Sequence, residues 1–166
     1  MQIINIKQMS ISKRGSNGWV QYCDAMIATG KVTYAAIIGR QDGNIYAISP
    51  EFSLTVGTST VALDNGQQKE VIVDEYGTVI AAYKSNDAGQ SATKISMNGI
   101  KYIIISWSDD GSTVYLKSEK GGACIVRTKK LFIIGVWSTQ DNLLNNGGSC
   151  NMVVEEMAES FMSANY

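Results

Sequence analysis

Histidine is absent from this sequence of 166 residues, and proline occurs once, at Pro50. Without histidine, the chain lacks the commonest general base and the commonest side-chain metal ligand of proteins. Nucleophile systems of the Ser–His and Cys–His types are therefore excluded. We expect a protein that catalyses no covalent chemistry and needs no cofactor or metal.

Cysteine is scarce as well. The three cysteines, Cys23, Cys124 and Cys150, are odd in number and widely spaced, which makes a poor disulfide framework. None of them forms a Cys-x-x-Cys pair, so the sequence does not favour a zinc site. We expect buried or half-buried thiols in a reducing cytosol.

Long apolar runs are missing. No stretch approaches the ~20 apolar residues that span a bilayer. The first eleven residues mix apolar and polar types and offer no signal-peptide core. Both absences lead us to expect a cytoplasmic protein.

Charge is sparse and unevenly distributed. Charged residues make up 17% of the chain, and the net charge is −1. Residues 1–18 hold Lys7, Lys13 and Arg14 and no acid, whereas the remaining 148 residues hold 11 basic and 15 acidic side chains. A nucleic-acid-binding protein would show a dense basic face, so we expect no such partner. We interpret residues 1–17 as a basic N-terminal extension and residues 18–166 as one domain.

The apolar pattern predicts a helix near each end of that domain. The first helix is predicted to run through Trp19–Ala28 and to end at Gly30, which suits a left-handed stop. The last is predicted from Ser149 to about Ser163, where apolar residues recur every four positions.

Short strand-like runs and tight turns fill the space between these helices. The turns Asp42-Gly43 and Asn65-Gly66 predict hairpins, and residues 78–84 have helical character. We interpret the apolar runs 103–105 and 132–134 as central strands that are covered on both faces. The predicted strands are 33–39, 45–49, 58–63, 70–73, 93–97, 101–107, 113–117, 123–127 and 131–137.

This order of elements predicts an α+β fold. We expect a central antiparallel sheet of about six to seven strands, because short turns join antiparallel neighbours. The N- and C-terminal helices should lie on one face and the short helix on the other. Sharing a face would bring Trp19 near Phe161 and Tyr166.

Several motifs carry a family resemblance by their order and spacing. They are Trp19-x-x-Tyr22, Ala-Ala-Ile-Ile-Gly at 35–39, Asp-Gly-Asn-Ile-Tyr-Ala at 42–47, Lys-Gly-Gly-Ala-Cys-Ile-Val-Arg-Thr-Lys-Lys at 120–130, Ile-Ile-Gly-Val-Trp at 133–137 and Cys-Asn-Met-Val-Val-Glu-Glu-Met-Ala-Glu at 150–159. Over about residues 18–166 the chain resembles the profilin family. Residues 1–17 precede the usual start, and a hairpin insertion at about 56–73 is similar to that of profilins from alveolate protists.

The resemblance implies a function and partners. Profilins bind monomeric actin and proline-rich segments of elongation factors such as formins, and they regulate actin polymerisation in the cytoplasm and cytoskeleton. Many also bind phosphoinositides, for which the basic set here would be Lys117, Lys120, Arg127, Lys129 and Lys130. We expect a monomer.

The resemblance also places a polyproline site between the two terminal helices. A polyproline helix has no N–H donors, so aromatic rings pack on its pyrrolidines while indole and phenol groups donate to its carbonyls. Ser160 stands where many profilins carry a histidine or tyrosine, and Phe161 stands where many carry leucine. The implied residues are Trp19, Tyr22, Tyr46, Phe161 and Tyr166.

An actin face is implied on the late strands and the start of the last helix. Apolar contacts would form its centre and lysines its rim. Ser106 stands where many profilins have an arginine, which removes an expected ion pair. The implied residues are Lys101, Ile104, Lys117, Lys120, Asn146, Gly147, Gly148, Asn151, Met152 and Glu156.

The residues leave other readings open, because fold does not fix function. Longin-like and roadblock-like trafficking modules share a helix–sheet–helix layout without binding actin. An adaptor that kept polyproline binding but lost actin is a further alternative, which Ser106 leaves open.

Overall fold

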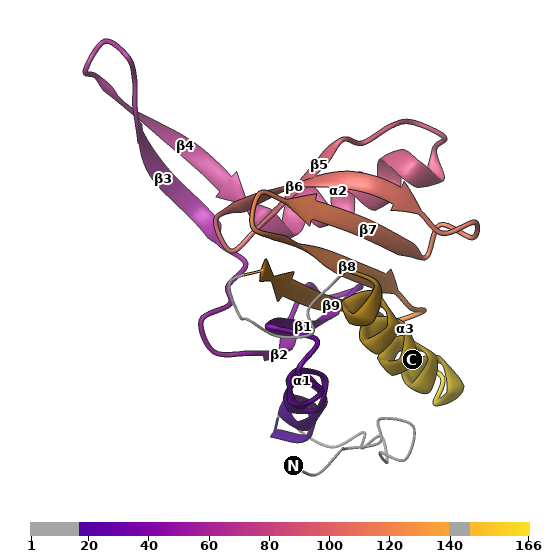
Figure 1. Cartoon of the computed structure of the whole chain (residues 1–166). Coiled ribbons are helices and arrows are strands. Elements are labelled where there is room, and N and C mark those ends of the chain that lie inside the picture. The colour runs from indigo at the N-terminus through magenta and orange to yellow at the C-terminus, as the bar shows by residue number, and fades with distance from the viewer. Residues whose placement is uncertain (1–16, 140–146) are drawn as a thin grey trace.

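The computed structural model describes residues 17–139 and 147–166. The predicted basic extension therefore lies outside the described residues, apart from Asn17. Figure 1 shows helices at both ends of the chain with strands between them. The elements are α1 (Asn17–Ala28), β1 (Tyr34–Gly39), β2 (Ile45–Ile48), β3 (Val56–Ala62), β4 (Gln68–Asp74), α2 (Glu75–Asp87), β5 (Lys94–Met97), β6 (Ile100–Trp107), β7 (Thr113–Ser118), β8 (Gly121–Arg127), β9 (Leu131–Ser138) and α3 (Gly147–Ser163).

Seven of the strands form one antiparallel sheet in the order β2-β1-β9-β8-β7-β6-β5. Each predicted strand is present, with its ends shifted by a few residues at most. The prediction of an α+β fold with a six- to seven-stranded antiparallel sheet is confirmed. Among the helices of the described residues, none has the length and hydropathy of a membrane-spanning segment.

The sheet separates two hydrophobic clusters. Helices α1 and α3 cover one face, and α2 covers the other (Figure 1). In β1, Ala35 and Ile37 face the terminal helices while Ala36 and Ile38 face α2. Residues 132–134 of β9 are buried on both faces, so their prediction as a central strand is confirmed. This alternation follows from the two-residue period of a strand.

The corresponding prediction for residues 103–105 is wrong. Ile103 is 64% exposed and Ile105 is 60% exposed. Strand β6 lies next to the edge strand β5, whereas α3 contacts β8 and β9. The terminal helices therefore leave the outer part of this sheet face uncovered. We call the uncovered surface of β6 and β7 on the terminal-helix side the open face; it carries Lys101, Ile103, Ile105 and Lys117.

The Asn65-Gly66 turn closes a separate two-stranded hairpin, as predicted. Strands β3 and β4 pair only with each other and project from the main sheet (Figure 1). All seven residues of β3 are exposed, and Ile72 of β4 is 86% exposed. With so little burial, this hairpin depends on its base for its position on the domain.

Glu75 forms a clasp at that base. The residue is only 2% exposed, and its carboxylate accepts hydrogen bonds from the backbone N–H of Thr55 at 2.6 Å and of Gly99 at 2.8 Å. Thr55 enters the hairpin, and Gly99 lies in the turn between β5 and β6. One carboxylate thus ties the hairpin, α2 and the sheet together.

All three cysteines are free and buried, as expected for reduced thiols. Burial raises the pKa of the Cys23 and Cys150 thiols to about 12, and it raises the pKa of Cys124 well above its usual value. Since the thiolate is the reactive form, these groups are both shielded and protonated at neutral pH.

Replacing Glu75 with alanine should lower the free energy of unfolding by about 2–3 kcal/mol, because the backbone N–H groups of Thr55 and Gly99 lose a charged acceptor. Glu75→Gln keeps one carbonyl acceptor and should cost about 1 kcal/mol. Urea unfolding followed by tryptophan fluorescence measures both changes. The matched control is Glu70→Ala on exposed β4, which should cost less than about 0.5 kcal/mol. Equal losses for Glu75→Ala and Glu70→Ala would contradict the clasp.

The native protein should react with Ellman's reagent at pH 8 far more slowly than free cysteine does. Because folding supplies both the burial and the raised thiol pKa, all three thiols should react rapidly in guanidinium chloride. Absorbance of the released chromophore measures the rate. A native thiol that reacts as fast as free cysteine would contradict this account.

Candidate binding surfaces

The first candidate site lies where α1 meets the end of α3. The Trp19 ring stacks on Phe161 with 5.6 Å between centroids and meets Tyr166 edge-on at 5.4 Å. Tyr46 of β2 lies 5.0 Å from Trp19, and Tyr22 lies 5.0 Å from Phe161. The structure therefore brings together all the residues of the predicted polyproline site, here called the aromatic cluster.

Exposure divides the aromatic cluster into two layers. Tyr22 and Phe161 have no exposed surface, and Trp19 is 8% exposed. Tyr46 and Tyr166 are half-buried and border the solvent. A ligand would therefore touch Tyr46, Tyr166 and an edge of Trp19, while Tyr22 and Phe161 support these rings from beneath.

Neighbouring polar groups hold the two outer rings. The Tyr46 hydroxyl donates to the Asp42 carboxylate at 2.9 Å, and burial together with this hydrogen bond raises the pKa of Tyr46. The Lys130 ammonium lies 5.4 Å from the centre of the Tyr166 ring, a cation–π arrangement. The Ser160 hydroxyl donates to a carbonyl one turn earlier in α3, so it extends no ring or donor toward the cluster.

The second candidate site is the open face beside the start of α3. A hollow of about 270 Å³ lies there, which we call the Trp137 hollow. Of the predicted actin-binding residues, Lys117, Gly147, Gly148 and Asn151 line it. Its other lining residues are Ile105, Tyr115, Leu116 and Trp137.

The other predicted actin-binding residues lie outside this lining. Lys101 and Lys120 are exposed on β6 and in the β7–β8 turn. Met152 is 55% exposed on the first turns of α3, and Glu156 lies one turn later, half-buried. Asn146 lies outside the described residues.

Ile104 is placed differently from the prediction. Its side chain packs against the cluster on the α2 face, because residues of a strand alternate between faces. Its neighbours Ile103 and Ile105 take the exposed positions instead. The sequence allowed two possibilities for the run of three isoleucines. If one face of the strand is uncovered, either the middle isoleucine or the two flanking ones must be exposed. Ser106 is also exposed and lies opposite Tyr115.

The Gly-Gly of the 120–130 motif makes room for Trp137. A Cβ at Gly122 would lie 2.7 Å from Trp137 Nε1 and 2.5 Å from the Leu116 carbonyl oxygen. Both distances are too short for a real side chain, so only glycine lets the indole lie against β8. The motif thus shapes the Trp137 hollow, although sequence reasoning did not include Trp137 in the site.

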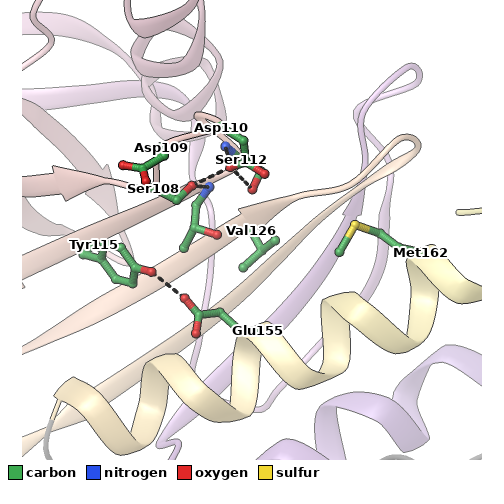
Figure 2. A pocket seen from close by; sticks show the side chains of 9 residues that line it. Ser108, Asp109, Asp110, Ser112, Tyr115, Val126, Glu155 and Met162 are labelled. Carbon is green, nitrogen blue, oxygen red and sulfur yellow. Dashed lines mark hydrogen bonds between the residues drawn. The ribbon is translucent and has the colours of Figure 1, made fainter.

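A third hollow, of about 400 Å³, lies between α3 and the β6–β7 turn (Figure 2). The Tyr115 hydroxyl donates to the Glu155 carboxylate at 2.5 Å, which raises the pKa of Tyr115. The Asp110 carboxylate accepts from Ser108 and Ser112, which lowers its pKa to about 2. These carboxylates hold the turn and α3 in place. No group of three or more potential metal ligands occurs among the described residues.

The basic set implied for phosphoinositides does not gather in one place. Lys117 and Lys120 lie at one end of the β7–β8 pair, whereas Arg127, Lys129 and Lys130 lie at or beyond the other end. Arg127 is moreover paired with Asp87 at 2.7 Å.

Comparisons with known proteins agree with this geometry. The family profile described as Profilin matches residues 17–166. A profilin from Tetrahymena pyriformis is 31% identical over 155 residues, which cover 90% of this chain and 99% of that protein. The solved structure of Acanthamoeba castellanii profilin IB aligns with a TM-score of 0.65 at 27% identity, covering 89% of this chain and 99% of that one.

A solved structure with a bound partner shares the fold at lower identity. Mouse profilin IIa in complex with a double repeat from the FH1 domain of mDia1 aligns with a TM-score of 0.59 at 16% identity, over 90% of this chain and 99% of that one. The family profile and the Tetrahymena relative each span most of the described domain. The chain therefore belongs to the profilin family.

Proposed function

We propose that this protein binds monomeric actin and proline-rich peptides, and so regulates actin polymerisation in the cytoplasm without catalysing a reaction. The observation that carries the proposal is the aromatic cluster, in which Trp19 of α1 contacts Tyr166 at the C-terminal end within a chain of the profilin family. The alternative of a module that does not bind actin is not favoured by this family membership.

The aromatic cluster suits a ligand that is rich in rings and poor in donors. Tyr166 and the exposed edge of Trp19 offer flat apolar surfaces for pyrrolidine rings. Because the Tyr46 hydroxyl already donates to Asp42, the indole N–H of Trp19 and the Tyr166 hydroxyl are the donors proposed for ligand carbonyls. The buried rings beneath fix these groups before binding, which keeps the ordering cost low.

The open face suits a protein partner. Ile103 and Ile105 supply exposed apolar surface, and Lys101 and Lys117 supply positive charge around it. This combination of an apolar centre and a charged rim is typical of protein–protein interfaces. The lysines would meet acidic groups on actin and would guide association more than they set affinity.

The two proposed surfaces lie toward opposite ends of α3. The Trp137 hollow contacts Asn151, and the aromatic cluster contacts Phe161. These positions are separated by about 15 Å along the helix, at 1.5 Å per residue. Actin and a proline-rich segment could therefore occupy the protein together, which would deliver actin monomers to a filament-elongating factor.

Tyr166→Ala should weaken binding of a ten-proline peptide at least about tenfold, because it removes an exposed ring and a donor. Trp19→Phe, which keeps a ring but removes the indole N–H, should weaken it as well. Isothermal titration calorimetry measures both, and Tyr34→Phe on the α2 face is the control. Unchanged peptide affinity in Tyr166→Ala would refute the peptide site, and loss of actin binding in the same variant would refute separate surfaces.

Ile103→Ser and Lys101→Glu should each weaken actin binding about tenfold or more, since one removes central apolar contact and the other reverses a rim charge. Pyrene-actin assembly, with and without each variant, reports the sequestered monomer. The control is Lys129→Glu, a matched charge reversal in the β8–β9 turn. If it weakened binding as much as Lys101→Glu, the placement of the actin surface would be wrong. If the wild-type protein left assembly unchanged, the actin proposal itself would fail.

A further inference from the structure

The β3–β4 hairpin has an open strand edge that neither proposed surface uses. Among the described strands, β3 pairs with β4 alone, and the hairpin projects from the main sheet (Figure 1). All seven residues of β3 are exposed. An exposed strand edge presents a row of backbone N–H and C=O groups with which another strand can pair. The outer edge of β3 is therefore accessible to a second chain.

The other strand edges of the described residues are protected against such pairing. Short strands, charged residues and prolines all discourage contact between sheet edges. Strands β2 and β5 have four residues each, and β5 includes Lys94. Strand β4 includes Lys69, Glu70 and Asp74. By contrast, β3 has the sequence Val-Gly-Thr-Ser-Thr-Val-Ala, with neither a charge nor a proline.

The ladder between β3 and β4 fixes which backbone groups of β3 point outward. Just beyond one end of the ladder, the Glu75 N–H donates to the Thr55 carbonyl at 2.9 Å. Beyond the other end, the Leu63 N–H donates to the Gln67 carbonyl at 2.7 Å. Opposite residues of an antiparallel ladder alternate between hydrogen-bonded and non-hydrogen-bonded pairs. Residues 57, 59 and 61 therefore bond to β4, and residues 56, 58, 60 and 62 direct their N–H and C=O groups outward.

The sequence of β3 is nearly symmetric about Ser59, which suits pairing with its own copy. When two antiparallel copies are centred there, Thr58 of each chain lies opposite Thr60 of the other, and Val56 lies opposite Ala62. These are the four outward-directed residues, so this register pairs every outward N–H and C=O of both strands. Threonine pairs across strands are favourable, and β3 brings no charges together.

We propose that the outer edge of β3 is a self-association surface, on which a second copy of this chain pairs antiparallel about a two-fold axis at Ser59. The two hairpins would form one continuous sheet in the order β4-β3-β3-β4. The contact is isologous and therefore closed. The edges that remain belong to the charged β4 strands, so assembly stops at the dimer. Because the contact is small, the dimer is weak and depends on concentration.

This surface does not depend on the proposed function. Strand β3 contributes no residue to the aromatic cluster or to the open face. The expectation of a monomer rests on the resemblance to profilins, whereas this hairpin is an insertion relative to most of them. A failure of dimerisation would therefore leave the actin and peptide proposals untouched.

Sedimentation equilibrium of the full chain tests the association from about 1 µM to about 1 mM, the range expected of a weak contact. The weight-average mass should rise with concentration toward twice the mass of one chain. Ser59→Lys should hold it at one chain throughout, because two lysines would lie directly opposite each other. The matched control is Gln68→Lys on exposed β4, which should dimerise as the wild type does.

Three results would overturn the proposal. They are a wild-type mass that never rises, a Ser59→Lys variant that dimerises like the wild type, and an equal loss of dimer in Ser59→Lys and Gln68→Lys. Ser59 is exposed, so its replacement should leave folding intact. Circular dichroism of both variants checks that the fold is retained.

Mixing two charge variants tests the register directly. Ser59→Lys and Ser59→Glu should each remain monomeric alone, since each places like charges opposite each other at the two-fold axis. An equal mixture places lysine opposite glutamate, so the two variants should bind each other at least about tenfold more tightly than either binds itself. A mixture that stays monomeric would refute pairing centred on Ser59.

Discussion

The arrangement of this protein depends on the two-residue alternation of a seven-stranded antiparallel sheet and on how unequally the helices cover it. Strand β9 is buried on both faces because α1 and α3 lie on one side and α2 on the other. Toward β6, neither terminal helix covers this side in the described part of the chain, and Ile103 and Ile105 face solvent. Each candidate surface follows from this geometry. The aromatic cluster forms where the two terminal helices meet, and the open face lies beyond the reach of α3.

The aromatic cluster serves the core and the proposed peptide surface with the same residues. Trp19, Tyr22 and Phe161 belong to the larger hydrophobic cluster, and only Tyr46 and Tyr166 reach the solvent. Interlocked rings of this kind are packed to the density of a protein interior, so they cannot adjust independently. A rigid platform costs little to order when a ligand binds, but it also means that changes to the inner rings act on stability and binding together. Residues at the rim are for that reason the informative ones to vary.

Three polar contacts join elements that are distant in the sequence. Glu75 connects the β3–β4 hairpin to the β5–β6 turn, Glu155 of α3 accepts from Tyr115 of β7, and Arg127 of β8 pairs with Asp87 of α2. In each case, a buried or half-buried group has a specific partner, as the cost of leaving such groups unsatisfied requires. The exception among the described residues is Thr33, whose buried hydroxyl oxygen has no hydrogen-bond partner.

The sequence by itself determined the helices, the strands, the hairpin turns and the five members of the aromatic cluster, because periodicity and turn residues are local signals and the profilin motifs fix the order of the elements. It did not determine which face of β6 is covered, because a run of apolar residues has the same pattern whether one side or both sides of the strand are buried. The sequence therefore predicts Ile104 for the actin face, whereas the structure exposes Ile103 and Ile105. Only the tertiary structure decided that Gly122 makes room for Trp137, and that Arg127 pairs with Asp87. These contacts join residues far apart in the chain, and their positions depend on strand register and on the reach of each helix, which no local pattern encodes.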